Sequence, residues 1–248
     1  MAEGPALARG STAPVPRPGR DLWLRVASAV VLAPLAVAAA YLGGPWFIGF
    51  WLIAAAGVLW EWMGLVAAAR ALPAMARAGW IALGALYAGA MLAAPLVVRA
   101  DATLGFIAMI FLFAVVWATD VAAYFAGRLI GGAKLWPAIS PNKTRSGAVA
   151  GALAGTAAGV AVAAVGGINP IAPTIILGLL LSVASQFGDL FESALKRRFG
   201  VKDASHAIPG HGGFMDRLDG FIAAALAAAL IGLARGGIDG AAGGFLLW

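Results

Sequence analysis

The chain has 248 residues, of which 62% are hydrophobic and 11% are charged, and it contains no cysteine. This composition lies far from the balance of soluble globular proteins, and it excludes disulfide bonds and thiolate metal sites. The formal net charge of +6 is spread over short polar segments between apolar runs. Such a distribution argues against a nucleic-acid-binding surface and is typical of a membrane-topology signal.

Residues 1–21 precede the first apolar run and are rich in Pro, Gly and Ala, with Arg9, Arg17 and Arg20 among them. Such a segment predicts a flexible tail. A cleaved signal peptide is the competing interpretation, and we disfavour it because no soluble domain follows for export. We therefore expect a flexible cytoplasmic tail, 1–21, and a single transmembrane domain, 22–248.

Seven apolar runs follow, each of a length that crosses a hydrocarbon core of about 30 Å as a helix. They lie near 24–42, 46–69, 79–98, 103–127, 146–167, 171–195 and 218–235. Backbone polar groups in lipid must be satisfied internally, and these runs are too long for barrel strands. The sequence therefore predicts an all-α, polytopic helical membrane protein with about seven transmembrane helices, within a range of about six to nine.

Most basic residues fall on one side of the membrane if every run is a span. This side would hold the N-terminal arginines, Arg70, Arg77, Arg128, Lys134, Lys143, Arg145, Lys196, Arg197, Arg198, Lys202 and Arg217. Only Arg99 and Arg235 would lie on the other side. Because basic loops stay in the cytoplasm, we expect a cytoplasmic N-terminus and polar segments that face the cytoplasm.

Four glycines recur at every fourth position of the fifth run: Gly147, Gly151, Gly155 and Gly159. On a helix they would share one face and let a neighbouring helix approach closely. That neighbour is either a second copy of the chain, in a homodimer, or another helix of the same chain. We favour packing within the monomer, since small-residue faces are common there.

The sixth run is polar on one side only. Within an arc of about 120° lie Ser182, Ser185, Gln186, Asp189, Glu192, Ser193 and Lys196. Carboxylates inside an apolar span need a cation, a partner or water. An internal ion pair of Asp189 or Glu192 with Lys196 is one interpretation. A reaction centre is the other, and we favour it because the next segment adds further carboxylates.

Asp216 and Asp219 stand three residues apart at the start of the seventh run and would share one helix face. Oxygen ligands of this kind suit a hard cation such as Mg²⁺, which commonly holds phosphate oxygens. Capping of the helix dipole by the two acids is the alternative.

The glycine-rich loop 209–213 precedes these two acids, and the backbone N–H groups of such a loop and the following helix form a natural phosphate cradle. His211 within this loop is a candidate for phosphate binding or proton transfer, although a loop histidine is usually just solvated.

Together these residues resemble the signature of the phosphatidate cytidylyltransferases. The resemblance rests on Ser193-x-Leu195-Lys196-Arg197-x4-Lys202-Asp203-x-Ser205-x2-Ile208-Pro209-x-His211-Gly212-Gly213-Phe214-x-Asp216-Arg217-Leu218-Asp219. Supporting segments are Asp120-x3-Tyr124-x2-Gly127-Arg128, Ser140-Pro141-Asn142-Lys143-Thr144, Ser185-Gln186-x-Gly188-Asp189-Leu190-x-Glu192 and Glu61-Trp62. The match is strong over about 117–220. One departure is Ser146, where many members carry Glu.

The resemblance implies a single catalytic domain, 22–248, that transfers the cytidylyl group of CTP to phosphatidate. The products are CDP-diacylglycerol, for phospholipid biosynthesis, and pyrophosphate. It implies Mg²⁺, with room for a second cation, held by Asp189, Asp216 and Asp219. The residues implied in catalysis are Lys196, Arg197, Lys202, Asp203, His211 and Arg217. Those implied in substrate binding are Asp120, Lys143, Thr144, Ser193, Gly212 and Gly213.

Other classes share parts of this pattern. CDP-alcohol phosphotransferases resemble the chain at Asp216-x-x-Asp219-Gly220, but their longer pattern of spaced aspartates is missing. A CTP-dependent lipid kinase would need the same cation and nucleotide, and transporters also carry intramembrane carboxylates. A scaffold would require none of the polar signature. We therefore expect a cytidylyltransferase of the bacterial inner membrane whose partners are CTP, phosphatidate and membrane lipid, with no nucleic acid.

Overall fold

The computed structural model describes residues 18–169, 171–201, 203–205, 207 and 212–248. This part forms helices and one small hairpin: α1 (Pro18–Leu42), α2 (Gly44–Ala68), α3 (Ala74–Ala100), α4 (Gly105–Leu129), β1 (Lys134–Trp136), β2 (Ser140–Thr144), α5 (Arg145–Val165), α6 (Ile171–Arg198), α7 (Met215–Gly236) and α8 (Ala241–Leu246). In the described part, six helices, α2 to α7, are long and apolar enough to cross a membrane.

Each of the seven predicted apolar runs lies on one helix, from α1 to α7. The chain is therefore a polytopic helical membrane protein, as predicted. The run near 103–127 forms a single unbroken helix, α4. The predicted tail falls mostly on residues 1–17, which lie outside the described residues. Helix α1 begins at Pro18, so the predicted boundary at residue 21 lies inside this helix.

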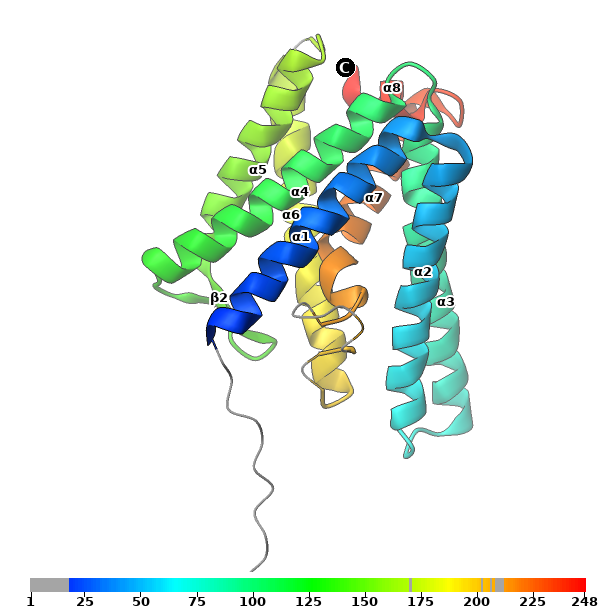
Figure 1. The fold of residues 1–248 in the computed structure, drawn as a ribbon, viewed down its shortest axis with the longest axis vertical. Helices are drawn as coiled ribbons and strands as arrows, with labels where there is room; N and C mark the ends of the chain where they lie inside the picture. Colours follow the sequence, from blue (N-terminus) through cyan, green and yellow to red (C-terminus); the bar gives the residue numbers. More distant parts are fainter. Residues whose placement is uncertain (1–17, 170, 202, 206, 208–211) are drawn as a thin grey trace, which may run out of the picture.

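The connections that carry most basic residues gather at one end of the bundle, the lower end in Figure 1. There lie the turn between α2 and α3, the hairpin that follows α4 and the C-terminal end of α6. The opposite end carries α8 together with Arg99 and Arg235, which occupy the last turns of α3 and α7. The charge asymmetry seen in the sequence is thus an asymmetry between the two ends of the fold.

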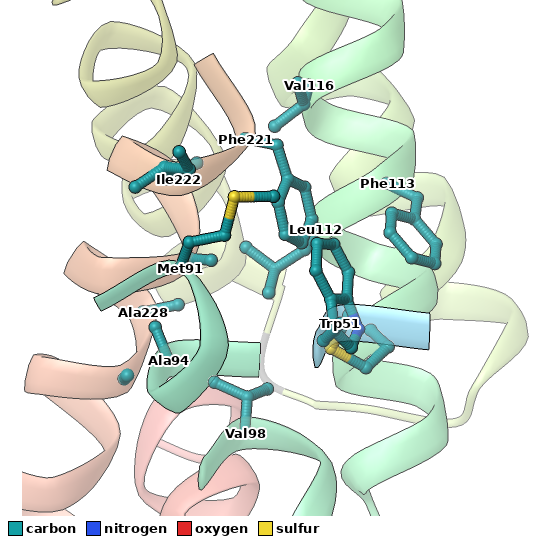
Figure 2. Close-up of a cluster of buried hydrophobic side chains, with 14 of the residues drawn as sticks. Trp51, Met91, Ala94, Val98, Leu112, Phe113, Val116, Phe221, Ile222 and Ala228 are labelled. Atoms are coloured by element: carbon teal, nitrogen blue, oxygen red, sulfur yellow. The ribbon is translucent and has the colours of Figure 1, made fainter. Parts of the chain in front are cut away.

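Side chains from α2, α3, α4 and α7 form a large part of the hydrophobic core, and Figure 2 shows a cluster of them. The ring of Phe221 stacks on Trp51 with centroids 4.8 Å apart, and it lies 5.4 Å from the ring of Phe113. Met91 and Leu112 fill the space beside these rings and are fully buried. Lipid tails are as apolar as these side chains, so close van der Waals packing holds the helices together.

The four-residue glycine repeat of α5 packs against α4 of the same chain, and all four glycines are buried. A Cβ atom on Gly151 would lie 2.9 Å from the carbonyl oxygen of Thr119, and one on Gly159 would lie 2.8 Å from Val115. Deeper in this interface the hydroxyl groups of Thr119 and Ser182 lie 2.6 Å apart and link α4 to α6. The interpretation as packing within the monomer is confirmed for this face.

A buried carboxylate links α8 to the connection between α3 and α4, at the end of the bundle opposite the hairpin. Asp101, between α3 and α4, accepts hydrogen bonds from the backbone N–H groups of Thr103 and Leu104 and from the Thr103 hydroxyl, at 2.9–3.0 Å. Its second oxygen accepts the N–H of Gly243 in α8 at 3.0 Å. Burial by itself raises the pKa of Asp101, but the hydrogen bonds from Leu104, Thr103 and Gly243 outweigh it and hold this pKa below the usual value.

This carboxylate makes a stability prediction with a definite pH dependence. Because the pKa of Asp101 is lower in the folded state, its contribution is full above the unfolded pKa of about 3.9 and is lost as pH falls through the folded value. We expect Asp101→Asn to lower the free energy of unfolding at pH 7 by about 2 kcal/mol, because an amide leaves one donor unpaired. Thermal melts in detergent should show this deficit shrinking below about pH 4. A deficit that stays constant down to pH 3 would contradict the account.

Candidate active site

A short hairpin between α4 and α5 carries the first polar group of the site. Its strands β1 and β2 are antiparallel, and β2 ends at Thr144, which is also the N-cap of α5. The Thr144 hydroxyl accepts the N–H of Gly147 at 3.1 Å, as N-cap threonines do. Lys143, one residue earlier, therefore sits on a fixed backbone, and it forms an ion pair with Asp189 of α6.

Two glycines allow α6 and α7 to cross closely beside this hairpin. Gly188 packs directly against the backbone carbonyl of Asp219, and a Cβ atom there would collide with it. Gly220 packs on Ser185, where an added Cβ would lie 2.6 Å from the hydroxyl oxygen. The close crossing brings the carboxylates of α6 and α7 together.

Three carboxylates meet at this crossing, and we call them the acidic cluster: Asp189, Glu192 and Asp219. One oxygen of each lies within 4.8 Å of the others. Asp120 of α4 lies close enough to Asp189 and Asp219 to interact with both electrostatically. An arrangement of oxygen ligands at this spacing suits a hard divalent cation.

Lys196 links the acidic cluster to the start of α7. Its ammonium group lies 2.7 Å from Glu192, one turn earlier on α6, and 2.5 Å from Asp216 on α7. The Glu192 and Asp216 side chains are only 2% and 9% exposed, so each depends on this shared cation. Part of the ion-pair interpretation is therefore correct, since Glu192 does pair with Lys196.

The first turn of α7 differs from the predicted phosphate cradle. Asp216 accepts the N–H of Gly213 at 2.8 Å and that of Ala204 at 3.3 Å. Glu61 of α2 accepts the N–H groups of Phe214 and Met215, both at 2.8 Å. The N–H groups of residues 213–215 thus already donate to carboxylates of the chain. The cradle expectation was wrong for these three groups, while residues 209–211 of the predicted loop lie outside the described residues.

The remaining predicted site residues lie at different places around the acidic cluster or outside the described residues. Arg197 lies beyond the cluster and donates to the carbonyl of Ile139 in the hairpin at 3.5 Å. Arg217 lies near Asp120 and is exposed, as is Asp203. Ser193 follows Glu192 on α6, and Gly212 has a left-handed φ of 81° beside Asp216. Lys202 and His211 lie outside the described residues, so their predicted roles stay predictions.

Formal charge is unbalanced within this group of contacts. Among the described residues, the contacts join five carboxylates, Asp120, Asp189, Glu192, Asp216 and Asp219, to three cations, Lys143, Lys196 and Arg217. Excess negative charge at the end of a membrane helix is costly unless a cation offsets it.

An apolar groove of about 370 Å³ lies between α5 and α6 beside the cluster. Its lining includes Trp136 of the hairpin, Val149 of α5, and Gln186 and Leu190 of α6. Gln186 and Leu190 flank Asp189 in sequence, so the groove runs along the part of α6 that carries Asp189.

The cytidylyltransferase family profile matches residues 69–233, which include all five of these carboxylates. The chain belongs to the cytidylyltransferase family. Proteins named phosphatidate cytidylyltransferase are similar to it. The one from Brucella suis biovar 1 is 48% identical over 154 residues, 62% of this chain and 57% of the relative. That from Bacillus subtilis is 39% identical over 145 residues, 58% of this chain and 54% of the relative.

A third relative of the same name, from Staphylococcus saprophyticus, is 45% identical over 115 residues, which cover 46% of this chain and 44% of the relative. The chain thus spans about half the length of the curated relatives that it matches. The family is shown over the helices that build the acidic cluster, while Glu61 lies before the matched segment.

Sequence reasoning gave no role at this site to three residues that the structure places in or beside it: Glu192, Tyr87 and Glu61. The sequence placed Glu192 on the polar face of α6 but gave it no role as a metal ligand. Asp216 was predicted as a ligand instead, since Asp216 and Asp219 share one face of α7. Tyr87 of α3 interacts with Asp219 and Glu192, and its ring lies 5.4 Å from that of Trp62. Glu61 meets the loop before α7 across more than 140 residues, and no local pattern signals such a contact.

The two lysines of the site should differ in their effect on stability. Replacing Lys196 by Met leaves two buried carboxylates without their shared cation, and we expect a loss of about 3–5 kcal/mol. Lys143→Met breaks a partly exposed pair and should cost less than about 1 kcal/mol. Thermal or denaturant unfolding in detergent measures both. Equal losses would show that Lys196 is not the structural link between α6 and α7.

Proposed function

We propose that the chain transfers the cytidylyl group of CTP to phosphatidate, giving CDP-diacylglycerol and pyrophosphate. The observation that carries this proposal is the acidic cluster, whose three carboxylate oxygens lie within 4.8 Å at the end of membrane-spanning helices. Family membership and the names of three relatives support the same reaction. A lipid phosphate and a nucleotide can meet at such a place, because one substrate stays in the membrane and the other comes from water.

Magnesium fits the donor set of the acidic cluster. Asp189, Glu192 and Asp219 offer only carboxylate oxygens, and Asp120 lies near enough to add another. When bound there, Mg²⁺ would supply neutralisation of the phosphate charge. Asp216 fits this role less well, since its two oxygens already accept Lys196 and two backbone N–H groups. We propose Asp189, Glu192 and Asp219 as the ligands.

The cations around the cluster would bind and orient the phosphates. Lys143, Arg197 and Arg217 lie on β2, α6 and α7, and two arginines suit bidentate contacts to phosphate. An oxygen of the phosphatidate phosphate would attack the α-phosphorus of CTP. The bond from this phosphorus to the bridging oxygen breaks, and pyrophosphate leaves with the electron pair. The nucleophile needs no strong base, since a phosphate monoester is already ionised near neutral pH.

The lipid substrate would approach from the membrane while CTP enters from the basic end of the bundle. The groove between α5 and α6 is an apolar surface beside the cluster along which an acyl chain would lie. Since most basic residues mark the end that holds the cluster, we propose that this end faces the cytoplasm. The relatives from bacteria, Brucella suis among them, favour the inner (plasma) membrane as its location.

The proposal is tested with CTP labelled at the α-phosphate, phosphatidate, Mg²⁺ and purified protein in detergent. We expect label in a lipid product, matched by released pyrophosphate, and loss of at least about a hundredfold in Asp219→Asn, as for other groups that stabilise transition-state charge. Asp239→Asn is the matched control, because Asp239 is exposed in the turn between α7 and α8. Label that stays in water-soluble CDP, with an unlabelled phosphate added to the lipid, would identify a lipid kinase and refute the transfer.

A further inference from the structure

Helix α2 holds the start of α7 through two residues one turn apart, Gly57 and Glu61, which we call the α2 socket. Glu61 is 2% exposed, and its carboxylate receives three hydrogen bonds from the segment before and at the start of α7. One oxygen accepts the Ser205 hydroxyl at 2.5 Å and the N–H of Phe214 at 2.8 Å, and the other accepts the N–H of Met215 at 2.8 Å.

Gly57 completes the socket sterically. The ring of Phe214 lies so close to it that a Cβ atom on Gly57 would be 2.7 Å from the ring. Gly213 fits Glu61 in the same way, since a Cβ there would lie 2.6 Å from the carboxylate carbon of Glu61. Residues 213–215 are therefore fixed in two ways. Carboxylates accept their N–H groups, and the absence of a Cβ atom on Gly57 and Gly213 lets α2 approach them closely.

A carboxylate in this position is well matched to its partners. The first N–H groups of a helix have no partner within the helix, and negative charge is favoured there. Hydrogen bonds to an ionised acceptor are about twice as strong as neutral ones. A glutamine would satisfy only part of the set, because its NH₂ group must face either the N–H of Phe214 or that of Met215.

We propose that the α2 socket positions the first turn of α7 for catalysis and that Glu61 is a positioning residue. Asp216 follows the held segment directly, and Asp219 lies one turn further along α7. A shift of residues 213–215 would therefore move Asp216 away from Lys196 and Asp219 away from the acidic cluster. The socket precedes residues 69–233, so it adds a catalytic requirement from a part of the chain that the family profile does not cover.

This inference rests on the proposed transfer reaction, and its test includes a readout that does not. The variants are Glu61→Gln and Gly57→Ala, with Ser205→Ala as a milder change that removes one of three bonds. Gly64→Ala on the same helix is the steric control, because a Cβ there meets nothing within 4 Å. Asp101→Asn is the control for loss of a buried, helix-capping carboxylate at the other end of the bundle.

The first measurement is hydrogen–deuterium exchange of the peptide that spans residues 212–218. We expect faster exchange in Glu61→Gln and Gly57→Ala and unchanged exchange in Gly64→Ala and Asp101→Asn. Unchanged exchange in both socket variants would overturn the proposal, whether or not the protein transfers cytidylyl groups.

The second measurement is the steady-state rate against CTP and phosphatidate, taken well below the melting temperature of every variant. Misplacement of catalytic groups by about 1 Å can lower turnover about a hundredfold, so we expect kcat to fall about 10–100-fold in Glu61→Gln and Gly57→Ala with little change in KM. Ser205→Ala should lose less. If Asp101→Asn loses as much kcat as Glu61→Gln, the effect is one of general stability and the proposal fails. An inactive wild-type protein would refute the transfer reaction, while the exchange result would still decide the positioning role.

Discussion

The structure depends on how buried carboxylates are compensated inside an apolar bundle. Glu192 and Asp216 lie on different helices, are almost fully buried and share the single ammonium group of Lys196. Removing a charge partner from such a site costs far more than an exposed ion pair contributes. The shared lysine therefore fixes α6 relative to α7, and the acidic cluster at their crossing depends on that relation.

Small residues supply the second constraint, because they set how closely the helices approach. Gly188 and Gly220 let α6 and α7 cross with almost no side chain between them, and the α5 glycines do the same against α4. The polar groups on these helices are then near enough to act together. The positions of the carboxylates therefore depend on the glycines that allow these close crossings.

Much of the fold could be predicted from the sequence, since apolar runs of membrane-spanning length have few alternatives to helices. The polar face of α6 was also visible, because it follows from helical periodicity. The choice between Glu192 and Asp216 could not be made in this way, since it depends on how α6 and α7 are rotated against each other. Glu61-Trp62 supported the resemblance, but the contacts of Glu61 could not be predicted for a related reason: its partners at residues 205, 214 and 215 become neighbours only after folding. The same contact takes up the N–H groups of Phe214 and Met215, which the sequence had suggested for binding phosphate.

We propose that Asp189, Glu192 and Asp219 form a divalent-cation site. Electron paramagnetic resonance of Mn²⁺ titrated into purified, detergent-solubilised protein detects such a site and requires no turnover. We expect bound Mn²⁺ that Mg²⁺ displaces, with binding weakened in Glu192→Gln and unchanged in Asp239→Asn. Equal Mn²⁺ binding by the wild type and Glu192→Gln, with both proteins folded, would contradict it.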